Sequence, residues 1–268
     1  VGTGVGEGTG FRTGHLRMDK VDPRLVQYDA ARTQRFYTLL TERARSAPGV
    51  QSAGLTQNPP LGLEAFDALA FVPDGFEMPR DRETFTSTMD TVDEGFFETM
   101  GVPMVRGRAF LASDTAEALR VAIVNEQFAK HYWPGADAVG KHIRLDGRNG
   151  APVEIVGVAR TGKYRTTGEK PTDFVYLPLP QHPVARMVLL LRSNGDAQTL
   201  VKSIKDVVLA LDPNLPLLEL RTYEDLYRYS TVDGPRVAIE LVGIMGAVGR
   251  GLAVAGLDGL VSYKFVRR

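Results

Sequence analysis

Cysteine is absent from the 268-residue sequence, and so is an excess of charge of either sign. Without cysteine the chain has no thiol nucleophile, no disulfide bond and no cysteine-based zinc site. The absence of cysteine does not indicate whether the protein resides in an oxidising or a reducing compartment. Lys and Arg total 32, and Asp and Glu total 32, which leaves a formal net charge of zero. Because no basic excess exists to release counterions from DNA or RNA, we expect no nucleic-acid partner.

A complete phosphate-binding loop is also missing, although one segment comes close to it. Residues 153–164, VEIVGVARTGKY, place Gly162 and Lys163 as the signature G-x-x-x-x-G-K-[ST] requires. Tyr164 then stands where a small hydroxyl must hold Mg²⁺, and the following RTTGEKPTD does not favour a helix facing the phosphates. We expect a strand running into a polar hairpin loop, and no nucleotide hydrolysis.

Other catalytic signatures are missing as well. No register of residues 1–14 fits G-x-G-x-x-G, and no serine lies in G-x-S-x-G. The histidines form no H-x-x-x-H pair, which argues against a zinc site; they are His15, His131, His142 and His182. Adjacent carboxylates such as Asp93 and Glu94 are explained as helix starts. A glycosidase pair assembled from distant residues is left open but has no support. We therefore predict that the chain is not an enzyme, with no cofactor and no catalytic, cofactor-binding or metal residues.

The two ends of the chain carry similar patterns, after a glycine-rich lead over residues 1–10. Residues 28–47 have helical spacing with Asp29 as the cap, and residues 50–56 read as a strand. The later elements are a strand at 187–191, a helix from Asp196 to Leu211 and a strand at 215–220. These units predict one layered, porter-like βαβ subdomain formed by residues 11–57 and 184–232, within an α+β fold.

Residues 58–183 are predicted to form an inserted, mainly β subdomain. Asp93 and Asn125 are expected to cap two short helices. The expected strands lie at 84–92, 102–110 with a turn at 106–108, 121–124, 143–145, 153–158 and 174–177. The aromatic residues Phe96, Phe97, Tyr132 and Trp133 are expected in the core, with a ligand-stacking cluster as the lesser alternative.

The C-terminal part is apolar and rich in small residues. Residues 237–263 have the length of a bilayer-spanning helix, and KFVRR follows as a basic flank. Arg250 and Asp258 lie inside this segment, and each is unfavourable near the centre of a bilayer. We expect an apolar helix of membrane origin, with a buried soluble helix as the alternative.

Long stretches of this sequence resemble a known family. The stretches are TVDEGFFETMGVPMVRGRAF (91–110), VAIVNEQFAKHYWPGADAVGKHIRL (121–145) and VEIVGVARTGKYRTTGEKPTDFVYLPLPQ (153–181), with further similarity over 34–50 and 211–226. They closely resemble the MacB-like periplasmic core domain of FtsX-like ABC transporter permeases, especially the acidobacterial-type permease group. The resemblance covers nearly the whole chain after the glycine-rich lead.

The resemblance implies a place and a role. Such a domain lies between the first and second transmembrane helices of a permease in the bacterial inner membrane and faces the periplasm. The apolar tail then looks like the start of the second helix, and this chain is a fragment of the permease. The implied role is non-catalytic: ATP binding to a separate ATPase closes a permease homodimer and moves these domains as rigid bodies, driving export or extraction of a substrate. In MacB-type exporters the further partners are a periplasmic adaptor protein and an outer-membrane channel.

Two other functions compete with this role. The chain would be a periplasmic binding module if the crevice between the subdomains captured a peptide, lipid or sugar. It would be a hydrolase if the isolated chain turned over a substrate, but no catalytic constellation supports that. The sequence names no cargo and no partner-binding residue.

Overall fold

The computed structural model describes residues 9–12, 14–62, 64–193, 197–215, 221–222, 225, 240, 242–246 and 248–250. The chain divides into two compact units, Val1–Leu226 and Tyr227–Arg268. The first unit contains all the labelled helices and strands. In the second unit, residues 240, 242–246 and 248–250 are helical. Over the described residues, no helix has both the length and the apolar character needed to cross a bilayer.

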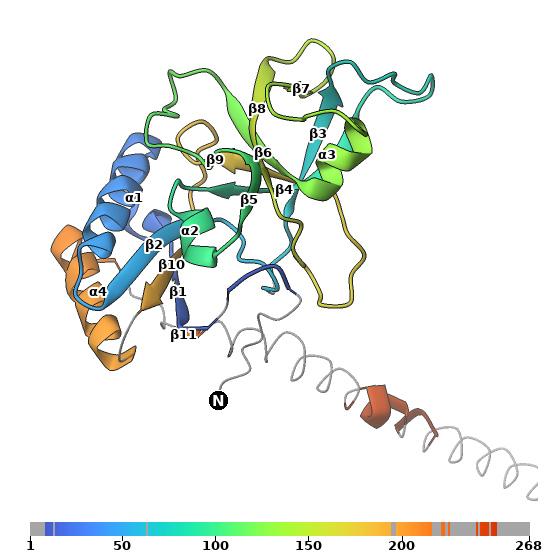
Figure 1. Ribbon diagram of the computed structural model, residues 1–268. Helices are drawn as coiled ribbons and strands as arrows, with labels where there is room; N and C mark the ends of the chain where they lie inside the picture. The colour runs from blue at the N-terminus through green and yellow to red at the C-terminus, as the bar shows by residue number, and fades with distance from the viewer. Residues whose placement is uncertain are drawn as a thin grey trace, which may run out of the picture. The chain divides into compact units, whose positions relative to one another are not determined.

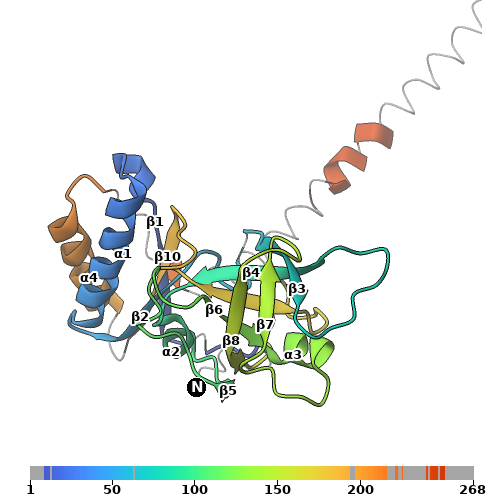
Figure 2. The same ribbon diagram turned by 90° about the horizontal axis from the view of Figure 1, so that it is seen from above.

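One part of the first unit is a sheet covered by helices, which we call the layered part. Its strands follow the order β11-β1-β10-β2 and all pair antiparallel. The helices α1 and α4 lie side by side on one face of this sheet (Figures 1 and 2). The elements are β1 (Leu16–Val21), the 3-10 helix η1 (Pro23–Val26), α1 (Ala30–Arg45), β2 (Val50–Thr56), β10 (Met187–Ser193), α4 (Ala197–Leu211) and β11 (Arg221–Thr222).

The other part is a closed ring of strands, which we call the barrel. Its strands follow the order β4-β3-β7-β8-β6-β9, and β9 pairs back with β4, so the ring closes. The strand β5 pairs with β8 outside this path. The elements are β3 (Asp67–Pro73), β4 (Phe85–Val92), β5 (Met104–Gly107), β6 (Val121–Asn125), α3 (Glu126–Tyr132), β7 (His142–Leu145), β8 (Pro152–Ala159) and β9 (Phe174–Pro178). The short helix α2 (Phe96–Met100) follows β4 in the chain but packs against β2 and β10 of the layered part.

A shared apolar core joins the two parts. Alternate residues of a strand point to opposite faces of the sheet. In β10, Leu189 and Leu191 therefore pack under α1 and α4, while Val188 and Leu190 belong to a second buried cluster. That second cluster, the shared core, also takes Phe174 and Tyr176 of β9, together with α2 and other barrel residues. A third cluster fills the barrel itself. The backbone link is narrow by comparison: a single residue pair among the described residues, Thr56 with Val92, joins β2 to β4.

Several local predictions are confirmed. The fold mixes helices and strands and is mainly β, and β2 occupies the predicted residues. Asp29 is the N-cap of α1 and accepts a hydrogen bond from the Arg32 N–H at 2.7 Å. Asn125 is the N-cap of α3 and accepts from the Phe128 N–H at 2.9 Å. Both helices therefore begin where a short polar side chain satisfies an otherwise unpaired backbone donor.

Other local predictions are wrong. Asp93 does not cap α2, because the N-cap residue is Gly95. The segment after β8 is not a hairpin loop, because β6 lies between β8 and β9. The helical spacing over residues 28–47 predicts Phe36, Leu39, Leu40 and Ala44 on the buried face of α1. Leu39 is instead 41% exposed, while the other three are buried and Tyr37, 1% exposed, joins them. The predicted aromatic core is buried but divided, since Phe96 and Phe97 belong to the shared core and Tyr132 and Trp133 to the barrel.

Some predictions fall on residues outside the described ranges. They are the cap at Asp196, the strand over residues 216–220, and the apolar segment beyond residue 250 with Asp258. Arg250 is described, helical and exposed.

Candidate functional site at the junction of the layered part and the barrel

The loop that resembles a phosphate-binding signature satisfies its own donors. The Glu169 carboxylate accepts hydrogen bonds from the backbone N–H groups of Tyr164 at 2.5 Å and Arg165 at 3.0 Å. Lys163 Nζ donates to the backbone carbonyl of Glu169. The Tyr164 side chain is 1% exposed, and its hydroxyl accepts from Asn125 Nδ2 at 3.2 Å. The donors that would hold a phosphate are therefore already bonded, to Glu169 within the loop and, for the Lys163 N–H, to the carbonyl oxygen of Thr9.

The histidines, which the sequence predicts not to form a zinc site, lie apart in the structure. The histidines lie on separate elements, where His131 Nδ1 is 2.7 Å from Asp173 Oδ2 and His182 Nδ1 is 3.2 Å from Thr91 Oγ1. Within the described ranges, His, Asp and Glu side chains form no group of three or more that could hold a metal ion.

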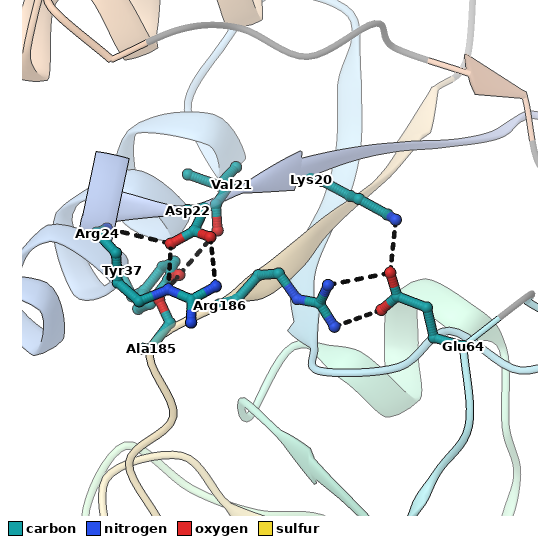
Figure 3. Close-up of polar contacts among 8 residues, drawn as sticks. All are labelled: Lys20, Val21, Asp22, Arg24, Tyr37, Glu64, Ala185 and Arg186. Atoms are coloured by element: carbon teal, nitrogen blue, oxygen red, sulfur yellow. Dashed lines mark hydrogen bonds and ion pairs between the residues drawn. The ribbon is translucent and has the colours of Figure 1, made fainter. Parts of the chain in front are cut away.

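Polar side chains instead gather where the layered part meets the barrel. Figure 3 shows the Lys20 and Arg186 side chains converging on Glu64. Lys20 Nζ lies 2.6 Å from Glu64 Oε1, and Arg186 makes a bidentate contact with the same carboxylate at 3.0 and 2.5 Å. Lys20 belongs to β1 and Arg186 precedes β10, whereas Glu64 lies on the chain that leads from β2 into the barrel. The cluster thus ties the layered part to the first segment of the barrel.

A neighbouring group of contacts orders the end of β1. Asp22 accepts hydrogen bonds from Arg24 Nε at 2.8 Å and Arg24 Nη2 at 2.6 Å, and this partner lowers the pKa of the Asp22 carboxyl. The Tyr37 hydroxyl lies 2.9 Å from the carbonyl oxygen of Val21 and 3.0 Å from that of Ala185 (Figure 3). One buried hydroxyl on α1 therefore holds both β1 and the segment that returns from the barrel.

A second ion-pair group crosses the junction beside α2. Arg45, near the end of α1, donates to Asp93 Oδ2 at 3.1 Å and to Glu94 Oε1 at 2.8 Å. Asp93 also accepts from the Leu55 N–H at 2.7 Å. Burial raises the pKa of Asp93 to about 7, with a further increase from Glu94, against the opposing effects of the Leu55 N–H and Arg45. Asp93 also accepts from the Gly95 N–H at 3.1 Å, so it joins α1 and β2 to the start of α2 although the N-cap residue itself is Gly95.

Another buried carboxylate, that of Asp90, lies beside Thr56, the β2 residue that pairs with Val92 of β4. Asp90 is 1% exposed and accepts hydrogen bonds from the Thr56 hydroxyl and from the Asn58 N–H, the latter at 3.0 Å. Burial raises the pKa of Asp90 well above its ordinary value, against the hydrogen bonds from Thr56 and Asn58. Because Asp90 and Asp93 are enclosed, they are suited to holding strands together and unsuited to meeting a substrate.

A small pocket lies at one end of the barrel. Its volume is about 230 Å³, and its lining includes Leu69, Val153 and Leu177 with Arg120 and His182. Binding pockets for small molecules commonly measure roughly 300–1,000 Å³, so this pocket is small for that purpose.

The chain is similar to known proteins in sequence and in fold. Residues 26–207 match the family model described as the MacB-like periplasmic core domain, and the match spans more than half of the chain. The chain belongs to the MacB-like periplasmic core domain family. The junction described above is therefore a feature of one member of this family.

One curated protein and several solved structures are similar to this chain. The uncharacterized ABC transporter permease YknZ of Bacillus subtilis (strain 168) is 23% identical over 130 residues, which are 47% of this chain and 32% of that protein. The aligned part is thus about a third of that relative's length. The crystal structure of the periplasmic region of MacB from Actinobacillus actinomycetemcomitans superposes with a TM-score of 0.51 at 13% identity, covering 88% of this chain and 97% of that one. The extracellular domain of YknZ from Gram-positive bacteria gives a TM-score of 0.46 at 13% identity, covering 76% of this chain and 100% of that one.

The sequence alone did not predict that the charged residues of the junction lie together. Glu64 and Arg186 are 122 positions apart, and Arg45 and Asp93 are 48 apart. Pairs at such separations leave no local spacing pattern. The available signal was limited to unexplained charges beside apolar runs, such as Asp19 and Lys20 within β1.

Proposed function

We propose that this chain is the periplasmic domain of an ABC transporter permease. In this proposal it performs no reaction. It transmits the conformational change that a partner ATPase drives, so that a substrate in the periplasm is exported or extracted. The observation that carries the proposal is the family match over residues 26–207. The permease YknZ, named as an ABC transporter permease, supports the same role.

The placement of the first and last strands supports a domain held between two membrane helices. The strand β11 pairs with β1 through Arg17 with Thr222 and Met18 with Arg221. A domain inserted between successive membrane helices needs its two connections close together, and neighbouring strands provide this. We therefore propose that the domain faces the periplasm from the bacterial inner membrane. Residues 237–263 would then be the start of a transmembrane helix.

The junction supports transmission as one body. We propose that residues 11–57 with 184–232 form the porter-like subdomain and that residues 58–183 form the inserted one. Opening a hinge between them would expose side chains of the shared core such as Phe96, Phe174 and Tyr176. Burial of one large apolar side chain contributes roughly 1.5–3 kcal/mol, so hinge opening is unfavourable. The ion pairs of Glu64 and Arg45 add directional restraint at its edges.

The proposed partners follow from the same role. They are an ABC-type ATPase, a second copy of the permease and, for a MacB-like exporter, a periplasmic adaptor protein with an outer-membrane channel. Motion driven by ATP on the other side of a membrane requires rigid-body displacement of the domain.

A labelling experiment tests this function. The full permease, with Lys130→Cys as its single introduced cysteine in this domain, is spin-labelled and reconstituted with its ATPase. Lys130 is an exposed residue of α3. We expect the distance between labels on two permease copies to change when ATP is bound. As a control, an ATPase with its P-loop lysine replaced should abolish the change. An unchanged distance in every nucleotide state would refute transmission by this domain.

The barrel pocket is the observation that favours a binding module as a second candidate. Its lining combines apolar side chains with Arg120 and Asp146, so it would accept a small group with both apolar and polar parts, although its volume of about 230 Å³ is small. A thermal-shift screen of peptides, lipids and sugars separates the candidates, because a ligand that binds the folded state raises the melting temperature. Strong stabilisation that Leu177→Trp removes would favour the binding module.

A further inference from the structure

The segment that precedes β1 is fastened to both parts of the domain. Residues 9–12 and 14, which we call the strap, run from a loop of the barrel to the start of β1. Thr9 is 2% exposed and Phe11 is 3% exposed, so this segment is held.

The first fastening point is Gly162, the glycine of the loop that resembles a phosphate-binding signature. The Lys163 N–H donates to the carbonyl oxygen of Thr9 at 2.8 Å, and the Phe11 ring packs edge-on against Tyr164 with centroids 6.0 Å apart. A Cβ atom on Gly162 would lie 2.5 Å from Phe11 Cζ, which is closer than real contacts allow. A side chain at position 162 would therefore displace the Phe11 ring from its present place against this loop.

The strap itself bends to reach this loop. Gly10 has φ +83°, a left-handed conformation that glycine adopts without strain. His15, just after the strap, has φ 57° and turns the chain into β1.

The second fastening point is Arg192 of β10. Its guanidinium donates to the carbonyl oxygens of Gly14 at 3.0 Å, of Arg12 at 2.6 Å, and of Thr99 at 3.0 and 2.6 Å. Thr99 lies in α2, where the last carbonyl groups of a helix lack partners within the helix. The Arg12 N–H donates to the carbonyl oxygen of Met100 at 2.8 Å. Arg192 thus joins the strap, the layered part and α2 through one side chain.

We propose that the strap is a mechanical coupling element, fastened by Gly162 and Arg192, that delivers force from the preceding chain to the barrel and the layered part together. This inference rests on the proposed function, because it names the contact through which that motion enters the domain. Without the fastenings the preceding chain would pull on β1 alone. Each released residue would add up to about 3.5 Å of slack.

Two glycines in one loop give a matched test. Gly162→Ala places a methyl group against Phe11, whereas a Cβ on Gly168 meets no described atom within 4 Å. We expect Gly162→Ala to accelerate amide hydrogen exchange at Lys163 and Arg12 at least tenfold. Gly168→Ala should leave both rates within twofold of the unmodified chain. Leu190, in the shared core, reports on the fold and should keep its protection in both variants. Equal exchange in the two variants would overturn the fastening at Gly162.

The clamp at Arg192 is tested in the same way. Arg192→Met removes every contact of the guanidinium while keeping a long side chain. We expect at least tenfold faster exchange at the Arg12 N–H, with Leu190 still protected. Unchanged exchange at Arg12 would show that Arg192 does not hold the strap.

A final experiment separates the strap from the function on which it rests. In the reconstituted permease labelled at Lys130, Gly162→Ala should reduce the ATP-driven distance change at least twofold, and Gly168→Ala should not. If the unmodified permease shows no distance change, the proposed function is wrong. If it shows one, and the two glycine variants behave alike, the function stands and the strap is not part of its path.

Discussion

Asp19 offers the sharpest test of how a buried charge affects this domain. It lies in β1 and is 3% exposed, and Oδ1 finds no hydrogen-bond partner within the described part of the chain. Val21 on the same strand packs under the helices, so Asp19, two residues earlier, faces the same layer. Burial raises the pKa of Asp19 to about 7, against the opposing effect of the Lys20 N–H.

The direction of the pH effect follows from this raised pKa. Asp19 has an ordinary pKa of 3.8, and between that value and about 7 the folded chain binds a proton that the unfolded chain has lost. Protonated Asp19 therefore stabilises the fold at low pH, and the free energy of unfolding falls as the pH rises through this window. A difference of about 3 pKa units at 1.36 kcal/mol each gives a loss of about 4 kcal/mol by pH 8.

The Asp19→Asn variant removes this titration while keeping the shape of the side chain. Urea unfolding of the chain and the variant at pH 5, 6, 7 and 8 measures the effect. From pH 5 to 8 we expect the variant to gain about 3 kcal/mol over the unmodified chain, because the pH range between 5 and the raised pKa of about 7 spans about 2 units at 1.36 kcal/mol each. With an m-value of about 2 kcal/mol per M, the midpoint difference grows by roughly 1.4 M over this range.

A matched control and a clear contrary result complete this test. Asp81 is exposed, so Asp81→Asn should show no such pH-dependent gain. Asp93, whose pKa is also raised to about 7, remains in all three proteins and cancels in the comparison. A stability difference between Asp19→Asn and the unmodified chain that stays constant from pH 5 to 8 would refute the reasoning.

Two further predictions concern the polar junction and the shared core. Glu64→Gln should lower the free energy of unfolding by about 1 kcal/mol, because it weakens the bidentate contact with Arg186 and the contact with Lys20. Urea unfolding in low and high salt checks this, and an equal loss in both would contradict an ionic cause. Tyr164→Phe should cost about 1 kcal/mol, because the buried amide of Asn125 loses one acceptor. The same assay would contradict this if the variant were as stable as the unmodified chain.

Local signals in the sequence predicted the elements that local chemistry controls. Asp29 and Asn125 begin helices because their side chains bond to the first free N–H groups, and such contacts span only three residues. The strand β1 was missed because Asp19 and Lys20 interrupt its apolar alternation. Its pairing with β10 and β11, both far away in the sequence, makes that segment a strand.

The candidate site could not be predicted in the same way. Asp93 was predicted to cap a helix because it precedes apolar residues. Its carboxylate also accepts hydrogen bonds from Arg45 and the Leu55 N–H, which are distant in the sequence and could not be predicted from local spacing. The loop at Gly162 and Lys163 matches most of a phosphate-binding pattern. Its glycine is instead explained by the strap, which contacts it from more than 150 positions away in the sequence.

The central claim is that the layered part and the barrel move together as one body. Residues 1–268 contain no cysteine, so spin labels at Arg35→Cys on α1 and Lys130→Cys on α3, both exposed positions, are the only thiol labels within this domain once any cysteine elsewhere in the permease is replaced. Doubly labelled permease is diluted with unlabelled copies and reconstituted with its ATPase, and the distance within one copy is recorded with and without ATP. The account predicts the same narrow distance distribution in both states. A distance that shifts or broadens when ATP binds would contradict it.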